Sequence, residues 1–380
     1  MQTGANSLKT AWTNFKEFVN LLGSGMSGSE VGRMVGTDTR TMYAYYARSV
    51  KETPDGTNKV VRWLRLAWYV FVAFLGKLTP ARRLFYVVAL VFFAMALWYG
   101  ELINAVYAFL VVNFILALEV AEKLMAKDEL EVARQIQLRL LPDSIDVVPG
   151  FSASAQSDVA TSVGGDYYDV LRLADGSTLV VIADVSGKGM SAALYAVKVQ
   201  TALQLLAQEH ADVRELLCRL NEHVASHLRR SYFLTIGVAR LFPDGTAQYC
   251  RAGHMPALLY RSATRTCEVL KPAGTAIGFA GANSGNGNGH AENGFGDSLE
   301  VETRKLEPGD SMLLYTDGLV EAADAKKEEF GEQRLKELLA REGWRSTAES
   351  RQLISSTLTS FRGPEPLRDD TTFVIVKRNG

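Results

Sequence analysis

The sequence predicts an α+β protein whose layered C-terminal domain follows a pair of apolar helices and a long connecting helix. Two runs without any charged residue, 84–100 and 102–118, are separated by Glu101 alone. The segment 119–141 contains neither Gly nor Pro and is rich in residues that favour helices. From residue 144 onward, short apolar strands occur in neighbouring hairpins and the helices occur in pairs. This pattern favours sheets with helices packed on them over alternating βαβ units.

The composition of the chain bears on two questions: whether it binds nucleic acid, and which atoms could bind a metal ion. The chain has 380 residues, which allows two or three domains, and its 41 basic and 42 acidic residues give a net charge of -1. This balance gives no support for a nucleic-acid partner. The cysteines and histidines are dispersed without the spacing of a zinc site, so oxygen ligands are the better candidates for any metal. A sparse, odd set of cysteines is typical of a reducing compartment.

Residues 1–83 form an N-terminal region to which the sequence assigns no role. The first part of this region is polar and lacks the early apolar core of a secretory signal. Val60–Gly76 is apolar but is interrupted by Arg62 and Arg65. This pattern fits either an interfacial helix or a marginal third membrane span, and both interpretations stay open.

The two charge-free runs predict a transmembrane helical hairpin over residues 84–118. Each run has about 17 residues, near the lower limit for crossing a bilayer, and Tyr99-Gly100-Glu101 would form the tip. Positive charges on both outer flanks predict that both ends lie in the cytoplasm, with the chain anchored in the inner membrane. These flanking residues are Arg82, Arg83, Lys123 and Lys127. The alternative is a buried helical pair within a soluble domain.

Residues 119–142 are predicted to form a connecting helix that ends at Pro142. Its apolar residues recur at nearly heptad spacing, at Val120, Leu124, Leu130, Ala133, Ile136 and Leu140. Such a stripe could pair with a second copy of the chain, which would give a homodimer through 119–141. It could equally pack on the helix's own domain. In either case, a helix that runs from the membrane into the next domain is suited to transmit a signal.

The remaining residues, 143–380, are predicted to form one domain. Pro243-Asp244-Gly245 is a hairpin turn between two apolar strands. The expected strands are Thr178–Ala183, Phe233–Phe242, Thr246–Arg251, Ala257–Tyr260, Thr266–Leu270, Ser298–Thr303, Ser311–Tyr315 and Phe373–Lys377. The expected helices are Met190–Ala207, Val213–Leu228, Glu332–Arg341 and Ala348–Phe361.

Four short acidic segments contain the candidate site residues of this domain. They are Gly164-Gly165-Asp166, Ala183-Asp184-Val185, Tyr315-Thr316-Asp317-Gly318 and Arg368-Asp369-Asp370. In three of them the Asp lies beside or within an apolar run that is typical of a strand. Carboxylates at strand ends near a buried core repel each other and lose water, and they are tolerated when a hard cation lies among them. The pattern therefore predicts a magnesium or manganese site and metal-assisted hydrolysis.

Seven motifs, in this order, resemble one protein family. They are Ile136-Gln137 with Leu140-Leu141-Pro142, Val163-Gly-Gly-Asp-Tyr-Tyr-Asp169, Ala183-Asp-Val-Ser-Gly-Lys-Gly-Met-Ser-Ala-Ala193, Arg251-Ala-Gly-His-Met-Pro256, Tyr315-Thr-Asp-Gly-Leu-Val-Glu321, Phe330-Gly331 and Asp369-Asp370-Thr371-Thr372. Together they are similar to the SpoIIE-like, RsbU-type branch of the PPM metal-dependent serine/threonine protein phosphatases. Each motif alone is a weak signal, but seven in the expected order are specific, and the resemblance covers about 119–380.

The resemblance implies a four-layer α-β-β-α sandwich with two Mn²⁺ or Mg²⁺ ions at one edge. By motif position, the metal ligands are the carboxylates of Asp166, Asp184, Asp317 and Asp369 and the backbone carbonyl of Val185. Asp184 would bridge the two ions. Asp184 and Asp317 would act in catalysis through the bound metal and its water, so that no protein nucleophile is needed.

Other residues near these motifs are weaker candidates. Asp370 could be a ligand in place of the residue before it, although the family motif favours that predecessor. Asp169 and Glu321 are expected to orient other groups or to face solvent. His254 is expected in a structural turn more than as a general acid. Lys188 could steer a phosphate group, but a solvated lysine is the commoner case.

The resemblance implies a membrane-anchored phosphatase that removes phosphate from serine or threonine of a bacterial regulatory protein. A phosphorylated anti-anti-sigma-like domain is the expected substrate. The alternative is a non-catalytic, phosphatase-like scaffold at the membrane, which would be marked by loss of the ligand aspartates. All four aspartates stand at their motif positions in this chain.

Overall fold

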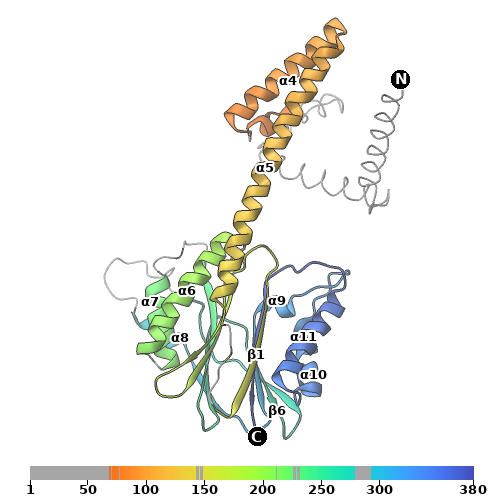
Figure 1. The fold of residues 1–380 in the computed structure, drawn as a ribbon. Helices are drawn as coiled ribbons and strands as arrows, with labels where there is room; N and C mark the ends of the chain where they lie inside the picture. The colour runs from red at the N-terminus through yellow and green to blue at the C-terminus, as the bar shows by residue number, and fades with distance from the viewer. Residues whose placement is uncertain are drawn as a thin grey trace, which may run out of the picture. The chain divides into compact units, whose positions relative to one another are not determined.

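The computed structural model contains two compact units, which divide between Leu124 and Met125 (Figure 1). The described residues are 68–69, 71–76, 78–142, 145, 149–210, 212–225, 228, 232–278 and 292–380. Most of the N-terminal region predicted at 1–83 lies outside the described residues, as does the part of Val60–Gly76 that precedes residue 68.

The first unit contains a helical hairpin made by α4 (Pro80–Tyr99) and the first part of α5 (Leu102–Leu140). Pro80 begins α4. Proline has no backbone N–H, and this costs nothing at the first position of a helix because an N–H there has no partner within the helix. Gly100 ends α4 in the left-handed conformation, with φ of 70°, and its N–H donates to the carbonyl of Ala96. The turn therefore falls at the predicted tip, and its geometry explains the glycine there.

Contacts between α4 and α5 show that the hairpin is antiparallel. Near the turn, the ring centroids of Phe92 and Tyr107 lie 5.5 Å apart. Farther from the turn, the guanidinium group of Arg82 donates to the Glu119 carboxylate at 2.8 Å. The first helix thus packs along the second from the tip to the start of the connecting segment.

Many large apolar side chains of this hairpin face outward. Leu97, Trp98 and Leu102, for example, are 74%, 85% and 80% exposed. By length and composition, α4 and α5 are each suited to crossing a membrane. In water, a surface of this kind would be unfavourable without a cover, because burial of apolar area is the main favourable contribution to folding.

The second unit contains two five-stranded antiparallel sheets (Figure 1). The first sheet has the order β1 (Phe151–Asp158), β10 (Thr371–Arg378), β9 (Ser311–Tyr315), β6 (Ala257–Arg261) and β7 (Thr266–Leu270). The second sheet has the order β2 (Asp166–Arg172), β3 (Thr178–Val185), β4 (Leu234–Leu241), β5 (Thr246–Ala252) and β8 (Val301–Lys305). The α+β class predicted from the sequence is confirmed.

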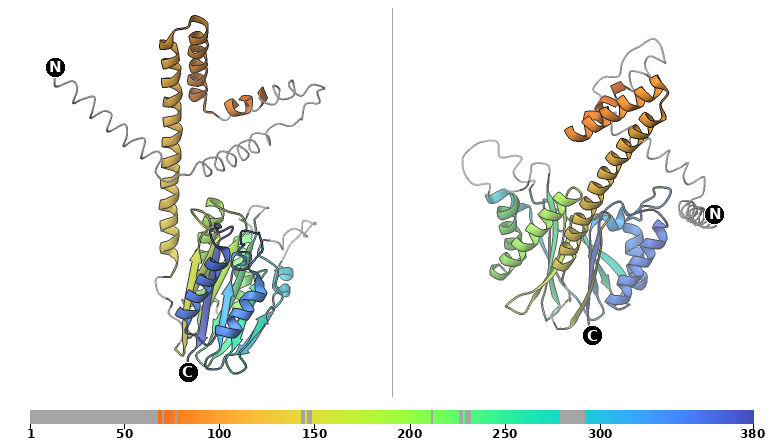
Figure 2. Two further views of the ribbon diagram at one scale, coloured as in Figure 1. Left: turned by 90° about the vertical axis from the view of Figure 1, so that its right-hand side faces the viewer. Right: turned by 45° about the horizontal axis from the view of Figure 1, so that its top comes forward.

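Helices cover the outer faces of both sheets (Figure 2). The second sheet is covered by α6 (Met190–Glu209) and α7 (Val213–Ala225), against which α8 (Glu292–Ser298) packs. The first sheet is covered by α10 (Gly331–Glu342) and α11 (Thr347–Arg362), and the short α9 (Asp317–Val320) follows β9. The C-terminal part of α5, from Met125 onward, also belongs to this unit.

Strand β3 shows how the apolar runs of the sequence produce this layering. Successive side chains of a strand point to opposite faces of the sheet. Accordingly, Leu179 and Val181 lie in the apolar cluster under α6 and α7, whereas Val180 and Ile182 lie in the cluster between the two sheets. A continuous apolar run is therefore needed here because both faces of the strand are buried.

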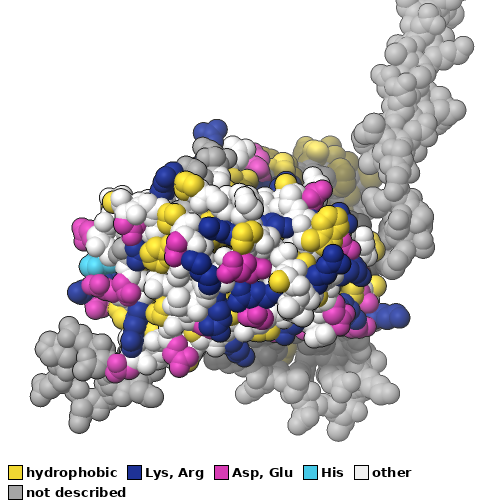
Figure 3. Space-filling model, turned by 90° about the horizontal axis from the view of Figure 1, so that it is seen from below, with side chains coloured by type: hydrophobic (Ala, Val, Ile, Leu, Met, Phe, Trp, Pro, Cys, Tyr) yellow, Lys and Arg dark blue, Asp and Glu magenta, His cyan; other side chains and the backbone are white. Residues whose placement is uncertain are grey.

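The surface of the second unit seen from below mixes positive and negative side chains (Figure 3). This mixture agrees with the nearly balanced charge of the chain.

Most predicted elements are confirmed to within a few residues, but three strands differ. The predicted strand Ser298–Thr303 starts too early, because Ser298 closes α8 by donating its hydroxyl to the Phe295 carbonyl. β1 and β2 were not predicted as strands. β1 is rich in serine and alanine and mostly half-buried, so it lacks a strong apolar alternation.

Candidate active site

Strand pairing in the second sheet brings the first two candidate aspartates together. Asp166 begins β2, and Asp184 lies near the end of β3. The two residues are direct partners in the β2–β3 register. Side chains of directly opposed residues lie on the same face of a sheet, with Cβ atoms about 4.5–5.5 Å apart. The pairing therefore places two carboxylates side by side.

The first sheet supplies the other aspartates from two adjacent strand ends. Asp317 follows the end of β9, and Asp369 precedes the start of β10. Just beyond the last strand pair, the backbone N–H of Thr316 donates to the carbonyl of Thr372 at 2.9 Å. The hydrogen bonding between β9 and β10 therefore continues to the strand ends next to Asp317 and Asp369.

The hydroxyl group of Thr316 connects the two sheets at this point. It donates to the Asp166 carboxylate at 2.8 Å and accepts a hydrogen bond from the backbone N–H of Thr372 at 3.0 Å. Thr316 is fully buried. All four acidic segments predicted from the sequence thus meet at one edge of the paired sheets.

The neighbouring Asp369 and Asp370 make different contacts. Both carboxylate oxygens of Asp370 accept backbone hydrogen bonds, from the N–H of Ala160 at 2.8 Å and of Gly165 at 2.7 Å. The carboxylate of Asp369 instead pairs with the ammonium group of Lys188 at 2.8 Å. Asp370 therefore holds the loop between β1 and β2, while Asp369 faces a cation.

Two glycines allow backbone segments of the site to approach closely. A Cβ atom on Gly318 would lie 2.0 Å from the carbonyl oxygen of Asp370. A Cβ atom on Gly165 would lie 2.7 Å from the carbonyl oxygen of Val185. Side chains at these positions would force the acidic segments apart, which explains the glycines beside Asp317 and Asp166.

Burial and mutual repulsion raise the pKa values of these carboxyl groups. Burial, followed by the charges of Asp317 and Asp369, raises the pKa of Asp184 from 3.8 to about 7. The pKa of Asp166 is raised well above its usual value by burial and by Asp184. Burial and the charge of Asp369 also raise the pKa of Asp317. The cluster therefore carries negative charge that the protein alone compensates poorly.

The donors present here suit a hard divalent cation. Carboxylate and backbone carbonyl oxygens are the ligands that Mg²⁺ and Mn²⁺ prefer. Lys188 shows that a cation is favoured, because its ammonium group binds Asp369 and offsets a part of the rise in the pKa of Asp184 that burial and the neighbouring aspartates cause. As the side chains stand, no group of three or more His, Cys, Asp or Glu residues in the described ranges is arranged to hold a metal ion. The donor chemistry fits a metal, whereas the ligand set named from the sequence stays a prediction.

The weaker sequence candidates lie in three different settings. Asp169 is buried away from the cluster, where it accepts hydrogen bonds from the Tyr167 hydroxyl at 2.7 Å and the Gln204 amide at 2.8 Å. Glu321 is exposed, and its pKa is raised by partial burial and by Asp317. His254 is buried, and burial lowers its pKa to about 3. A neutral imidazole at pH 7 is not a ready proton donor.

Sequence reasoning gave no role to one residue that contacts the site loop. The side-chain amide of Gln137, in α5, donates to the carbonyl of Gly164 at 2.7 Å and accepts from the N–H of the same glycine at 3.1 Å. Gln137 belongs to the first of the seven motifs, so a signal was present. Its partner lies 27 positions away, however, and periodicity alone does not reveal such a contact.

The paired antiparallel sheets and the aspartates at their common edge define a phosphatase domain of the PPM type, also called PP2C-like. The sequence model of the family described as Stage II sporulation protein E (SpoIIE) matches residues 174–379, which is more than half of the chain. The chain therefore belongs to the SpoIIE family, whose members are generally metal-dependent phosphatases. The resemblance stated from the motifs is confirmed.

Similar proteins support the same assignment. The phosphoserine phosphatase RsbU of Bacillus subtilis is 27% identical over 258 residues, which cover 66% of this chain and 70% of RsbU. Protein IcfG of Synechocystis is 29% identical over 280 residues, which cover 66% of this chain but only 42% of IcfG. The structure of the SiaA-PP2C domain of Pseudomonas aeruginosa covers 68% of this chain and 98% of that domain, with 23% identity and a TM-score of 0.56. The last similarity supports the fold alone.

We expect the metal-free protein to lose stability as the pH rises from about 4 to about 7, relative to the Asp184→Asn variant. The folded-state pKa of Asp184 lies above its usual 3.8, so the folded state binds the proton more tightly than the unfolded state. Stability from this group is present at low pH and declines through this window. Thermal midpoints of both full-length proteins, measured with a chelator across the window, test this. A constant difference between the two proteins would contradict it.

We expect Gly318→Ala to lower the free energy of unfolding by about 1–3 kcal/mol, because the added methyl group overlaps the Asp370 carbonyl. Gly294→Ala is the matched control, since a Cβ atom there meets nothing within 4 Å. Chemical denaturation of the full-length variants provides the measurement. Equal stability of the two variants would show that the acidic segments are not held closely together.

Proposed function

We propose that this protein is a membrane-anchored, metal-dependent protein phosphatase that hydrolyses phosphoserine or phosphothreonine on a regulatory protein. The main support is the convergence of Asp166, Asp184, Asp317 and Asp369 from two sheets onto one edge. Burial and mutual repulsion raise the pKa values of Asp166, Asp184 and Asp317, which is expected of carboxylates gathered around a cation site. The name of RsbU, a phosphoserine phosphatase, supports the same reaction.

In this proposal, two Mn²⁺ or Mg²⁺ ions are held by Asp166, Asp184, Asp317, Asp369 and the carbonyl of Val185. When bound, such ions ionise a water molecule and stabilise charge on the transferring phosphoryl group. Asp184 would contact both ions, and Asp184 and Asp317 are the residues on which catalysis would depend most. No serine, cysteine or histidine nucleophile is then required.

Neighbouring residues keep the carboxylates in position. The hydroxyl of Thr316 donates to one oxygen of Asp166 and so holds this carboxylate in place. Both carboxylate oxygens of Asp370 accept hydrogen bonds from backbone N–H groups of the loop that precedes β2. Because these oxygens already have partners, Asp369 is the better candidate for the metal ligand of the pair. Lys188 is exposed beside Asp369, and its ammonium group is suited to attract the anionic substrate.

We also propose that residues 143–380 form the four-layer α-β-β-α phosphatase domain and that 84–118 anchor it in the inner membrane. Three apolar clusters, one between the sheets and one under each helical layer, support the layering. The outward apolar side chains of α4 and α5 support a lipid cover, and the flanking positive charges favour a cytoplasmic phosphatase domain. A phosphorylated anti-anti-sigma-like domain is the proposed substrate.

A signal could reach the site through α5, which is one uninterrupted helix over Leu102–Leu140. Its C-terminal part holds Gly164 through Gln137, two residues before Asp166. The exposed Val132 and Ile136 on the same helix support the homodimer proposed through 119–141. We therefore propose that a change in α5 shifts the loop that carries Asp166.

We expect Asp184→Asn and Asp317→Asn to lower the rate of phosphoserine hydrolysis more than about 100-fold, since loss of even an outer partner of a metal ligand costs about 10–100-fold. Asp297→Asn is the control, because this aspartate is exposed on α8. Phosphate release by the full-length protein with Mn²⁺ provides the measurement. Full activity of the two site variants would contradict the proposed roles of Asp184 and Asp317, and no activity in the wild type would favour the non-catalytic scaffold.

We expect a flexible Gly-Ser insertion at Lys127 to change the phosphatase activity, because it breaks the helix between the apolar hairpin and Gln137. Gln137→Ala should alter activity by about tenfold through the loop that carries Asp166. Gln135→Ala is its control, since that side chain is exposed two positions earlier. Unchanged activity in both the insertion and Gln137→Ala proteins would rule out this route.

A further inference from the structure

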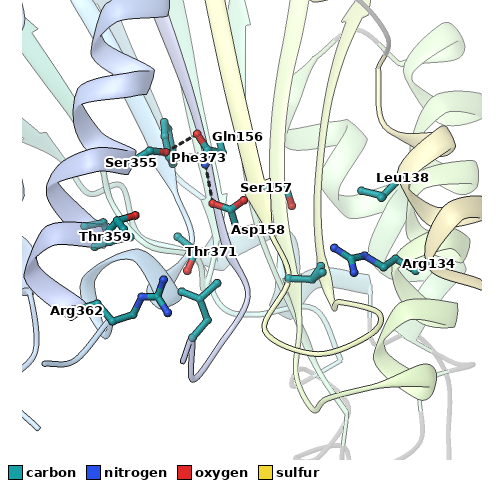
Figure 4. A pocket seen from close by; sticks show the side chains of 13 residues that line it. Arg134, Leu138, Gln156, Ser157, Asp158, Ser355, Thr359, Arg362, Thr371 and Phe373 are labelled. Carbon is teal, nitrogen blue, oxygen red and sulfur yellow. Dashed lines mark hydrogen bonds between the residues drawn. The ribbon is translucent and has the colours of Figure 1, made fainter. Parts of the chain in front are cut away.

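A pocket with a volume of about 430 Å³ lies beside the proposed catalytic edge (Figure 4). Its wall includes the ends of β1 and β10 together with side chains from α5 and α11. Asp158 and Thr371, which both line the pocket, are partners in the β1–β10 register. Thr371 directly follows Asp370, so one wall of the pocket continues into the loop that carries the candidate ligands.

Two arginines supply most of the charge of this pocket. Arg134 enters from α5, and Arg362 enters from the end of α11 on the opposite side, with each guanidinium group directed toward the space between them (Figure 4). One acidic side chain, that of Asp158, lines the pocket, and it accepts a hydrogen bond from the Gln156 amide at 2.7 Å. The lining is therefore positive overall.

Both guanidinium groups have unused donors. The Nε atoms of Arg134 and Arg362 are buried without a hydrogen-bond partner. The closest acidic contact of Arg134 is a long one, 3.9 Å to Glu131, and Arg362 donates one Nη1 bond to the backbone carbonyl of Glu365. A guanidinium group has five N–H donors and matches planar oxyanions well. A buried donor without a partner is unfavourable, so an acceptor here would be bound favourably.

The mixed lining of the pocket favours a side chain over a small ion. Its lining also contains apolar groups, among them Leu358 and Phe373, which are almost fully buried. Methylene groups could pack on this surface while a terminal carboxylate reaches the arginines. Acidic side chains on a protein substrate have this combination of apolar stem and charged end.

We propose that this pocket binds an oxyanion carried by an acidic side chain of the phosphoprotein substrate, close in sequence or in space to the phosphorylated residue. Arg134 and Arg362 are then specificity-determining residues. The proposal rests on the phosphatase function proposed above, and it adds a second recognition site beside the metal ligands.

The test compares phosphoserine peptides that differ only in having glutamate or glutamine at successive positions around the phosphoserine. The full-length protein is assayed with Mn²⁺ as wild type and as Arg134→Gln and Arg362→Gln. Arg341→Gln is the control, because Arg341 is an exposed arginine on α10 that does not line the pocket. Arg362→Lys keeps the positive charge at this position. If it retains part of the preference for glutamate peptides that Arg362→Gln loses, the charge is responsible for the preference.

We expect the wild type to prefer a glutamate peptide, and we expect this preference in kcat/KM to fall about tenfold or more in both glutamine variants. The control should keep the preference, and Arg362→Lys should recover part of it. A wild-type enzyme that hydrolyses glutamate and glutamine peptides equally at every position would overturn the proposal.

Titration of inorganic phosphate into the metal-free proteins separates the two sources of an oxyanion. Phosphate binding that is lost in Arg134→Gln and Arg362→Gln, without any peptide preference, would assign the pocket to a free anion and overturn the substrate assignment. If the wild type hydrolyses no phosphoserine peptide at all, the proposed phosphatase function fails. Phosphate binding that depends on both arginines would then still support an oxyanion site, and binding unchanged in the variants would overturn it.

Discussion

The repulsion among carboxylates at one edge of two packed sheets is the constraint on which the rest of the second unit depends. Asp184 belongs to the buried strand β3, and this burial raises the pKa of its carboxyl group. The charges of Asp317 and Asp369 raise the pKa further. Close packing of glycines and backbone carbonyls forces this crowding, because no side chain separates the segments. A cation among these carboxylates would relieve the repulsion.

The second unit maintains this crowding with buried polar contacts that cross from sheet to sheet. Thr316 donates to Asp166 across 150 positions of sequence, and Asp370 holds Gly165 across 205. Three apolar clusters keep the layers in place around these contacts. Polar hydrogen bonds therefore determine the positions of the candidate aspartates, while apolar packing provides most of the stability of the surrounding layers.

The sequence predicts the elements with strong local signals and leaves out those defined by distant contacts. The buried β3 and the turn at Gly100 follow from apolar runs and from glycine geometry. β1 is half-buried and rich in serine, so its pattern is weak. Asp369 and Asp370 are identical in type and adjacent, and only their different hydrogen-bond partners distinguish them. The candidate aspartates are thus predictable, whereas the residues that orient them are not.

The paired hydrogen bonds between Gln137 and Gly164 have a mechanical consequence. Both bonds use one side-chain amide, so they form and break together. A helix advances by about 100° per residue, and turning α5 by that amount would carry the amide away from the glycine. Rotation of α5 about its own axis would therefore break both hydrogen bonds at once and release the loop at Gly164 from the helix.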